Sequence, residues 1–206
     1  MRTKLKICGV TTTKDAQSLV DLGVDAIGIN FYPKSKRYIA SEKAKPFLEK
    51  IRGKIERVGV FVDADIDFVK QLFTDDLIDV AQLHGNESDA YCKELINHDM
   101  EFIRVIRVEA GDKKIKAPNL ASKRILLDTH VADYGGAGQR FDWKLATQFI
   151  QQHPELEVIM AGGITPENIT KATAIKPYMI DVASGAESSP GIKDLVKINA
   201  FLKATI

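Results

Sequence analysis

Residues 5–30 read LKICGVTTTKDAQSLVDLGVDAIGIN, and this stretch decides how the rest of the chain is interpreted. An apolar run at 5–8 is followed by a segment of helical period, with Thr12 as its N-cap and Gly23 at its end, and then by a second apolar run at 26–30. The two runs are nearly continuous rather than alternating, which is typical of parallel strands covered by helices. A strand, a helix and a second strand of this kind predict a βαβ unit.

Six further apolar runs repeat this unit along the chain, at 57–62, 80–84, 102–108, 124–128, 157–162 and 179–184. Most are followed by a helical pattern, with Asp65 as one N-cap and Thr165 as another, the latter before a proline at the first helical position. The exception is 109–123, where the helical pattern is weak and a proline interrupts it. Strands alternating with helices, and no second compositional zone, predict a single α/β domain over residues 1–206 that folds as a (β/α)8 barrel, or TIM barrel. An open doubly wound sheet is the main alternative.

Composition excludes several classes of protein. The net charge of +1, without a concentrated basic face, argues against nucleic-acid binding. Two cysteines are too few for a disulfide framework, and no uncharged apolar run approaches the length of a membrane span. The amino-terminal residues lack the pattern of a signal peptide. We therefore expect a cytoplasmic protein without nucleic-acid or membrane partners; monomer and homodimer both remain open.

Two glycine-bearing segments end the last two predicted strands, AGG (161–163) and ASG (183–185). In a parallel barrel the active site lies at the carboxyl ends of the strands, and the loops after the seventh and eighth strands often bind phosphate. Glycine lets the backbone approach a ligand, and free N–H groups at a helix start attract an anion. The alternative is that these glycines only form tight turns. The residues predicted to hold a phosphate group are Gly162, Gly163, Ser184 and Gly185.

Cys8 and Asp128 end the first and sixth predicted strands, so they can face each other across the barrel mouth. A proton donor and a proton acceptor on opposite sides of a substrate suit an isomerase. The competing interpretation of Cys8 is a small buried apolar residue, because a thiol of ordinary pKa is only a few per cent ionised at neutral pH. For Asp128 it is a cap of the glycine-rich loop at 135–138. Cys92 lies within a predicted helix and is interpreted as structural.

Arg37 and His84 are two further candidates for the site. Arg37 follows the second strand and can bind a carboxylate with two hydrogen bonds, although a solvated surface arginine is the common alternative. His84 ends the fourth strand and is interpreted as a substrate contact or a structural residue. The four histidines show no metal-binding spacing, so we expect no metal site.

An ordered set of motifs across nearly the whole chain resembles the phosphoribosylanthranilate isomerase family. The motifs are KICG (6–9), GVDAIG (23–28), SKR (35–37), VGVF (58–61), QLHG (82–85), LLD (126–128), GGAGQRFDW (135–143), AGG (161–163), PEN (166–168) and DVASGAESSPGIKD (181–194). The chain departs from the family pattern at Thr12, where a basic residue is common, and in VASGAE (182–187), where many members have two serines and a valine. These departures leave Cys8, Asp128 and Arg37 in place.

The resemblance implies an Amadori rearrangement of N-(5-phosphoribosyl)anthranilate to 1-(2-carboxyphenylamino)-1-deoxyribulose 5-phosphate in tryptophan biosynthesis, without a cofactor. By the same resemblance Asp128 is the general acid on the furanose oxygen, and Cys8 is the general base that removes the C2 proton. Arg37 then holds the anthranilate carboxylate and the glycine segments hold the phosphate. The residues implied to line the site in lesser roles are Gln82, His84 and Asp181.

Three other functions are alternatives to the isomerase. A metal-dependent sugar-phosphate epimerase requires metal-spaced His and Asp residues, and indole-glycerol-phosphate synthase requires catalytic Lys and Glu residues at strand ends. Neither set is evident in the sequence. A non-catalytic phosphate-binding barrel would keep the glycines but has no need of both Cys8 and Asp128 at the mouth.

Overall fold

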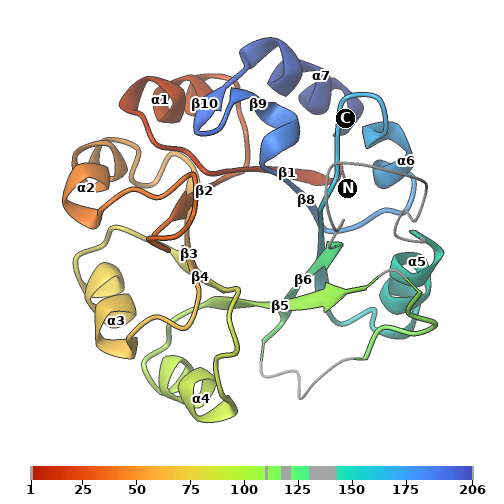
Figure 1. Ribbon diagram of the computed structural model, residues 1–206, viewed down its shortest axis with the longest axis horizontal. Helices are drawn as coiled ribbons and strands as arrows, with labels where there is room; N and C mark the ends of the chain where they lie inside the picture. The colour runs from red at the N-terminus through yellow and green to blue at the C-terminus, as the bar shows by residue number, and fades with distance from the viewer. Residues whose placement is uncertain (1, 110, 117–121, 130–142, 206) are drawn as a thin grey trace.

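Eight parallel strands form a closed barrel in sequence order, and helices surround it (Figure 1). The structure is a computed structural model that describes residues 2–109, 111–116, 122–129 and 143–205. The strands are β1 (Lys4–Cys8), β2 (Ala26–Asn30), β3 (Glu56–Phe61), β4 (Val80–Leu83), β5 (Phe102–Val108), β6 (Arg124–Thr129), β7 (Glu157–Ala161) and β8 (Met179–Val182). Because β8 pairs with β1, the sheet has no edge. The predicted (β/α)8 barrel is confirmed, and the open sheet is excluded.

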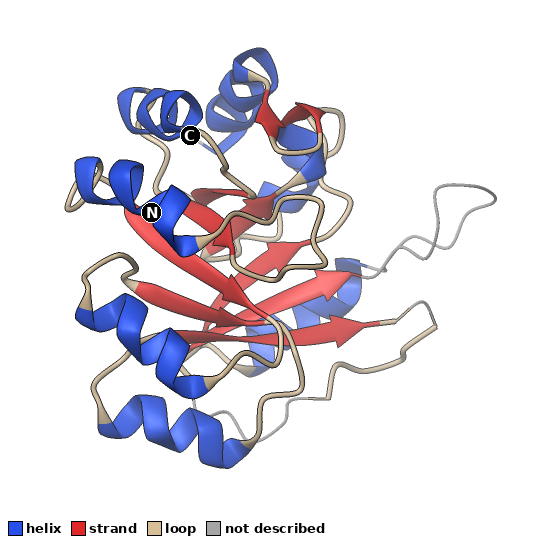
Figure 2. Cartoon of the chain, turned by 60° about the vertical axis from the view of Figure 1, so that its left-hand side comes forward, coloured by secondary structure: helices blue, strands red, loops and turns tan. Residues whose placement is uncertain are grey.

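The helices lie outside the strands (Figure 2). They are α1 (Thr13–Asp21), α2 (Ser41–Lys50), α3 (Ile66–Thr74), α4 (Asp89–Asn97), α5 (Trp143–Gln152), α6 (Ile169–Thr173) and α7 (Leu195–Thr205). Thr12 and Asp65 cap α1 and α3 as predicted, each accepting a hydrogen bond from a backbone N–H of the first turn. Of the residues described between β5 and β6, none is helical, in line with the weak pattern there. No helix in the described ranges is long and apolar enough to cross a membrane.

The connection after β7 differs from the prediction. Its first regular helical residue is Ile169, four residues after Thr165, the predicted N-cap. Asn168 explains the difference, because its side-chain oxygen accepts from the Thr165 N–H at 2.9 Å and its amide donates to the Gly163 carbonyl at 2.8 Å. These bonds hold the preceding residues in a turn beside the AGG segment, so the helix itself is short.

After β8 the chain forms a short 3-10 helix, η1 (Ser184–Ala186), and then a small antiparallel hairpin of β9 (Glu187–Ser189) and β10 (Ile192–Lys193). This hairpin separates β8 from the last helix. It brings Glu187 and Lys193, both buried, beside the carboxyl end of β1.

The barrel interior is filled by side chains, so a ligand can enter only at one of its ends. Its apolar layer is formed by one or two residues from each of seven strands: Ala26, Val58, Val80, Ile103, Leu126, Ile159, Ala161 and Met179. A larger apolar cluster lies between the strands and the helices. Lys6 stands out among the buried residues, because its side chain is wholly enclosed at 0% exposure.

Candidate active site

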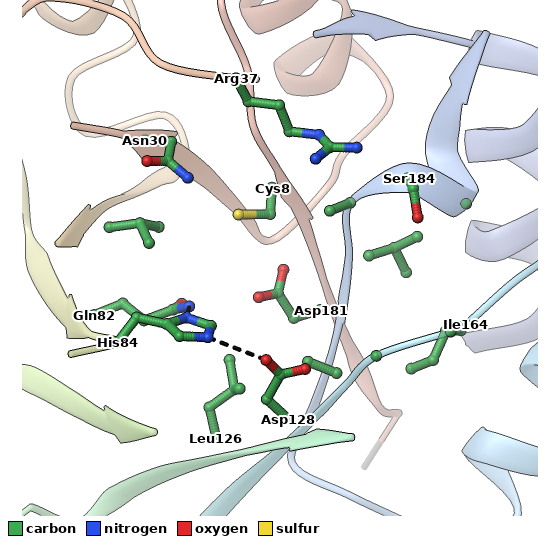
Figure 3. A pocket seen from close by; sticks show the side chains of 17 residues that line it. Cys8, Asn30, Arg37, Gln82, His84, Leu126, Asp128, Ile164, Asp181 and Ser184 are labelled. Atoms are coloured by element: carbon green, nitrogen blue, oxygen red, sulfur yellow. Dashed lines mark hydrogen bonds and ion pairs between the residues drawn. The ribbon is translucent and has the colours of Figure 1, made fainter. Parts of the chain in front are cut away.

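A cavity of about 220 Å³ lies at the carboxyl ends of the strands. The structure places every predicted site residue around it: Cys8, Arg37, Gln82, His84, Asp128, Gly162, Gly163, Asp181, Ser184 and Gly185. Asn30 and Ile164 line it as well, whereas Cys92 is buried in α4, away from the cavity. The residues that the sequence scattered over the whole chain therefore converge on one site (Figure 3).

The floor of the cavity carries a buried ion pair. Lys6 Nζ lies 2.8 Å from Asp181 Oδ2 and donates a second hydrogen bond, at 2.9 Å, to Gln82 Oε1. Burial alone would lower the pKa of the Lys6 ammonium, but its interactions with Asp181 and Cys8 outweigh burial, so its pKa is raised. Lys6 therefore carries a positive charge in the folded protein.

Lys6 was not among the residues predicted for the site. The signal that points to it is a lysine in the middle of an apolar strand, since lysine is almost never fully buried unless it is paired. Its partner is 175 positions away in the sequence, which no local pattern reveals.

The Cys8 thiol is buried at the end of β1 but forms part of the cavity wall. Burial raises its pKa, and Lys6 and Lys193 oppose that effect, whereas the charge of Asp181 adds to it. The balance keeps Cys8 a neutral thiol at neutral pH in the free protein. A role as a base requires that the bound substrate or its neighbours favour the thiolate.

Across the cavity from Cys8, His84 and Asp128 form a pair (Figure 3). His84 Nε2 lies 3.1 Å from Asp128 Oδ2, and the other ring nitrogen lies 3.4 Å from the amide of Gln82. A histidine–carboxylate pair that carries one proton can deliver it from either partner. The alternative role of Asp128, as a cap of the loop at 135–138, concerns residues outside those the structure describes.

Arg37 enters the cavity from the loop after β2, and the hairpin after β8 holds it. Its Nε and Nη2 donate to the two carboxylate oxygens of Glu187 at 2.8 and 2.6 Å. Lys193 Nζ lies 2.7 Å from the same carboxylate and also donates to the Cys8 carbonyl. Burial would raise the pKa of the Glu187 carboxyl, but Arg37 and Lys193 outweigh it and lower the pKa. Sequence reasoning missed both hairpin residues, although they lie within the motif DVASGAESSPGIKD (181–194).

The two glycine segments lie against each other on one wall of the cavity. A Cβ on Gly185 would overlap the backbone carbonyl oxygen of Ile164, so only glycine permits this approach. Backbone groups of AGG (161–163) and of the start of η1 therefore face the same space. Closely spaced backbone N–H groups at such turns form anion-binding concavities.

Comparisons with known proteins decide the family. The model of the family described as N-(5'phosphoribosyl)anthranilate (PRA) isomerase matches residues 5–204. The chain belongs to this family. An N-(5'-phosphoribosyl)anthranilate isomerase of Geobacter sp. (strain M21) is 40% identical over 203 residues, which cover 97% of this chain and 96% of the relative. That of Thermotoga neapolitana is 36% identical and covers 97% of each chain.

Solved structures of PRA isomerases agree with this assignment. The enzyme from Thermus thermophilus superposes with a TM-score of 0.83 at 32% identity, and that from Thermotoga maritima with 0.82 at 33%, each covering 98% of both chains. A further phosphoribosyl anthranilate isomerase was solved with reduced 1-(o-carboxyphenylamino)-1-deoxyribulose 5-phosphate, and it superposes with a TM-score of 0.78 at 31% identity. The family predicted from the sequence motifs is confirmed, and with it an isomerase that acts on a sugar phosphate derivative.

Proposed function

We propose that this chain catalyses the Amadori rearrangement of N-(5-phosphoribosyl)anthranilate in tryptophan biosynthesis, with Cys8 as general base and Asp128 as general acid. The observation that carries the proposal is their placement in one cavity. A thiol and a histidine-paired carboxylate line opposite sides of it, in a member of the PRA isomerase family (Figure 3). Acid–base work on the two faces of a sugar requires such an arrangement.

Ring opening is the first step. Asp128, which lies 3.1 Å from His84, acts as the general acid and protonates the furanose ring oxygen while the bond between that oxygen and C1 breaks. The lone pair of the anthranilate nitrogen forms the C1=N bond, which yields a cationic Schiff base. Asp128 then regains its proton from solvent, while the ring oxygen keeps the one it received as a hydroxyl group.

Proton abstraction from C2 is the second step. The cationic nitrogen acidifies the C2 proton, and the Cys8 thiolate removes it. The electron pair of that C–H bond forms C1=C2 and neutralises the nitrogen. The resulting enolamine becomes the ketone when C1 takes up a proton and the C2 hydroxyl loses one to solvent. Because the nitrogen serves as the electron sink, no step requires a metal or an organic cofactor.

The substrate is oriented from its two ends. Its phosphate lies against the backbone of the two glycine segments, and its carboxylate meets the guanidinium of Arg37, which Glu187 holds through Nε and Nη2. Within the described residues, Asp181 Oδ1 is buried without a hydrogen-bond partner, and Asp181 lines the cavity. A hydroxyl group of the bound sugar would satisfy this oxygen.

Cysteine substitution tests the assignment directly. Freshly made phosphoribosylanthranilate is added and the loss of its fluorescence is followed. Cys8→Ala is expected to lower kcat by about 10²–10⁴-fold, the range for one acid–base residue, and Asp128→Asn should do the same. Cys92→Ala, which removes a thiol outside the cavity, should keep the rate of the parent protein. Equal losses at both cysteines, or full turnover in Cys8→Ala, would contradict the proposal.

A further inference from the structure

The fully buried Lys6 ammonium is bonded to two groups of the cavity floor and lies beside the Cys8 thiol. Two of its hydrogen bonds go to Gln82 Oε1 and Asp181 Oδ2, at 2.9 and 2.8 Å. An ammonium has three N–H donors, so one remains beyond these two bonds. The Cys8 thiol is the further group that interacts electrostatically with this ammonium.

Gly28 on the neighbouring strand shows how closely the lysine and the thiol approach each other. A Cβ at this position would lie 2.6 Å from Cys8 Sγ and 3.1 Å from Lys6 Nζ. Both groups therefore occupy the space beside one glycine, and any larger residue would displace the sulfur. The sequence leaves this position without a side chain in a strand whose other buried residues carry one.

We propose that Lys6 is a positioning residue for the reaction: it holds the Cys8 sulfur and Asp181 in place and stabilises the thiolate that removes the C2 proton. The inference rests on the proposed role of Cys8. Before abstraction the thiol proton leaves to solvent through the open cavity, and the negative charge on sulfur then lies against the ammonium. After abstraction Cys8 is a neutral thiol again.

The charges around Cys8 single out Lys6 among its neighbours. Asp181 on β8 bears a negative charge and disfavours the thiolate, whereas Lys6 on β1 and Lys193 on β10 favour it. Lys193 is bound to Glu187 at 2.7 Å, and it donates a second hydrogen bond to the Cys8 carbonyl rather than to the sulfur. Lys6 is thus the cation between the thiol and Asp181, where it separates two negative charges that would otherwise repel each other.

Alkylation of Cys8 measures this effect without reference to turnover. In a Cys92→Ala background only Cys8 remains, and its thiolate displaces iodide from iodoacetamide to form a thioether that mass spectrometry quantifies. Lys6→Met is compared with Lys4→Met, which removes a lysine from the same strand whose Nζ instead donates to the Tyr178 hydroxyl at 2.6 Å. We expect Lys6→Met to move the midpoint of the pH–alkylation curve upward by at least one pH unit, so that the rate at pH 8 falls about tenfold. Lys4→Met should leave the curve in place.

A second pair of variants covers the case in which Lys6→Met does not fold, since it leaves Asp181 buried without its partner. Lys6→Met/Asp181→Asn removes both charges, and its control is Asp181→Asn, which keeps the lysine. Slower alkylation in the double variant supports the inference. Identical pH curves within either pair overturn it. Failure of the proposed catalytic role has a different signature, namely full turnover in Cys8→Ala while Lys6 still governs alkylation.

Discussion

At the scale of single residues, Gly28 belongs to the site although it contributes no functional group. Its Cα faces Cys8 and Lys6 so closely that a methyl group would meet Sγ at 2.6 Å and the Cys8 Cα at 3.0 Å. The backbone atom cannot rotate away as a side chain can. The smallest substitution at this position therefore forces the thiol out of its place.

Gly28→Ala is expected to lower kcat by about 10²-fold, the cost of misplacing a reacting group by roughly 1 Å. Gly53→Ala is the matched control, because Gly53 has a φ of +68° and, among the residues described, no atom lies within 4 Å of where its methyl group would be. The control should lose about 1 kcal/mol of stability from backbone strain and keep its kcat. Steady-state kinetics and urea unfolding of both variants measure these effects. Unchanged kcat in Gly28→Ala would show that the sulfur is free to move.

The individual residues of the site were also the hardest feature to predict from the sequence. Cys8, Asp128 and Arg37 were predicted because each lies at or after the carboxyl end of a predicted strand. Active sites of such barrels are built at that end. Lys6 and Glu187 were not predicted, because each acts through an ion pair with a residue far away in the sequence. Asp181 lies 175 positions from Lys6, and Arg37 lies 150 positions from Glu187. The burial of a side chain and its ion pairing depend on the fold, and the apolar pattern of a single strand indicates neither.

At the scale of elements, the hairpin of β9 and β10 is a support for Arg37. Glu187 binds the guanidinium through both oxygens and is itself held by Lys193. This arrangement fixes an arginine that otherwise projects from a long loop. A carboxylate ligand then meets a guanidinium whose orientation is already set.

Glu187→Gln is expected to raise KM about tenfold, which corresponds to the loss of one charge-assisted hydrogen bond in the support of Arg37. Because the change leaves buried Lys193 without its counter-ion, stability should fall by about 3 kcal/mol. Initial rates over a range of substrate concentrations and urea unfolding test the two effects. A KM equal to that of the parent protein would remove Arg37 from substrate binding or Glu187 from its support.

The pH dependence of stability offers a separate test of the same element. The folded protein holds the pKa of the Glu187 carboxyl below its unfolded value, so its contribution is present above about pH 4.3 and is lost as the pH falls toward the folded value. Other carboxyl groups titrate in this range as well, so the measured quantity is the difference between the parent protein and Glu187→Gln. That difference should shrink on acidification. A difference that stays constant with pH would contradict the assignment.

Elements were predicted with uneven success for physical reasons. The strands were located within one or two residues because buried parallel strands produce continuous apolar runs. The helix after β7 was placed three residues too early, with Thr165 instead of Asn168 as its N-cap, since Asn168 captures the N–H of Thr165 in a turn. In the last helix, α7, the buried face contains Ile198 and Phe201, whereas the apolar residue Ile192 precedes the helix and lies in β10.

At the scale of the whole molecule, the two ends of the barrel have different tasks. The carboxyl end carries the cavity, whereas the amino end is tied together by Arg124 at the start of β6, which bonds to Glu56 at 2.7 Å and to Glu157 at 3.0 Å. In barrels of this type, polar residues at the amino end serve stability rather than catalysis. The two functions should therefore be separable by mutation.

Arg124→Met is expected to lower the free energy of unfolding by about 1–3 kcal/mol, because it removes the cation paired with Glu56 and leaves Glu157 with Lys123 alone. Its kcat and KM should equal those of the parent protein. Arg37→Met, at the opposite end, should lower kcat/KM by more than about tenfold if Arg37 binds the substrate carboxylate. A loss of turnover in Arg124→Met at a temperature where it remains folded would mean that the two ends are coupled.

Closure of the barrel has a consequence for the order in which the protein is made. Lys6 lies opposite Asp181 in the register that joins β1 to β8, so the first strand and the last one complete each other. A ribosome releases the amino-terminal lysine long before it has synthesised the aspartate. Until then an ammonium inside an apolar strand has no counter-ion, and burying it is costly. We therefore expect the first strand to take its final place only after the eighth has emerged, so that the active site forms late in synthesis.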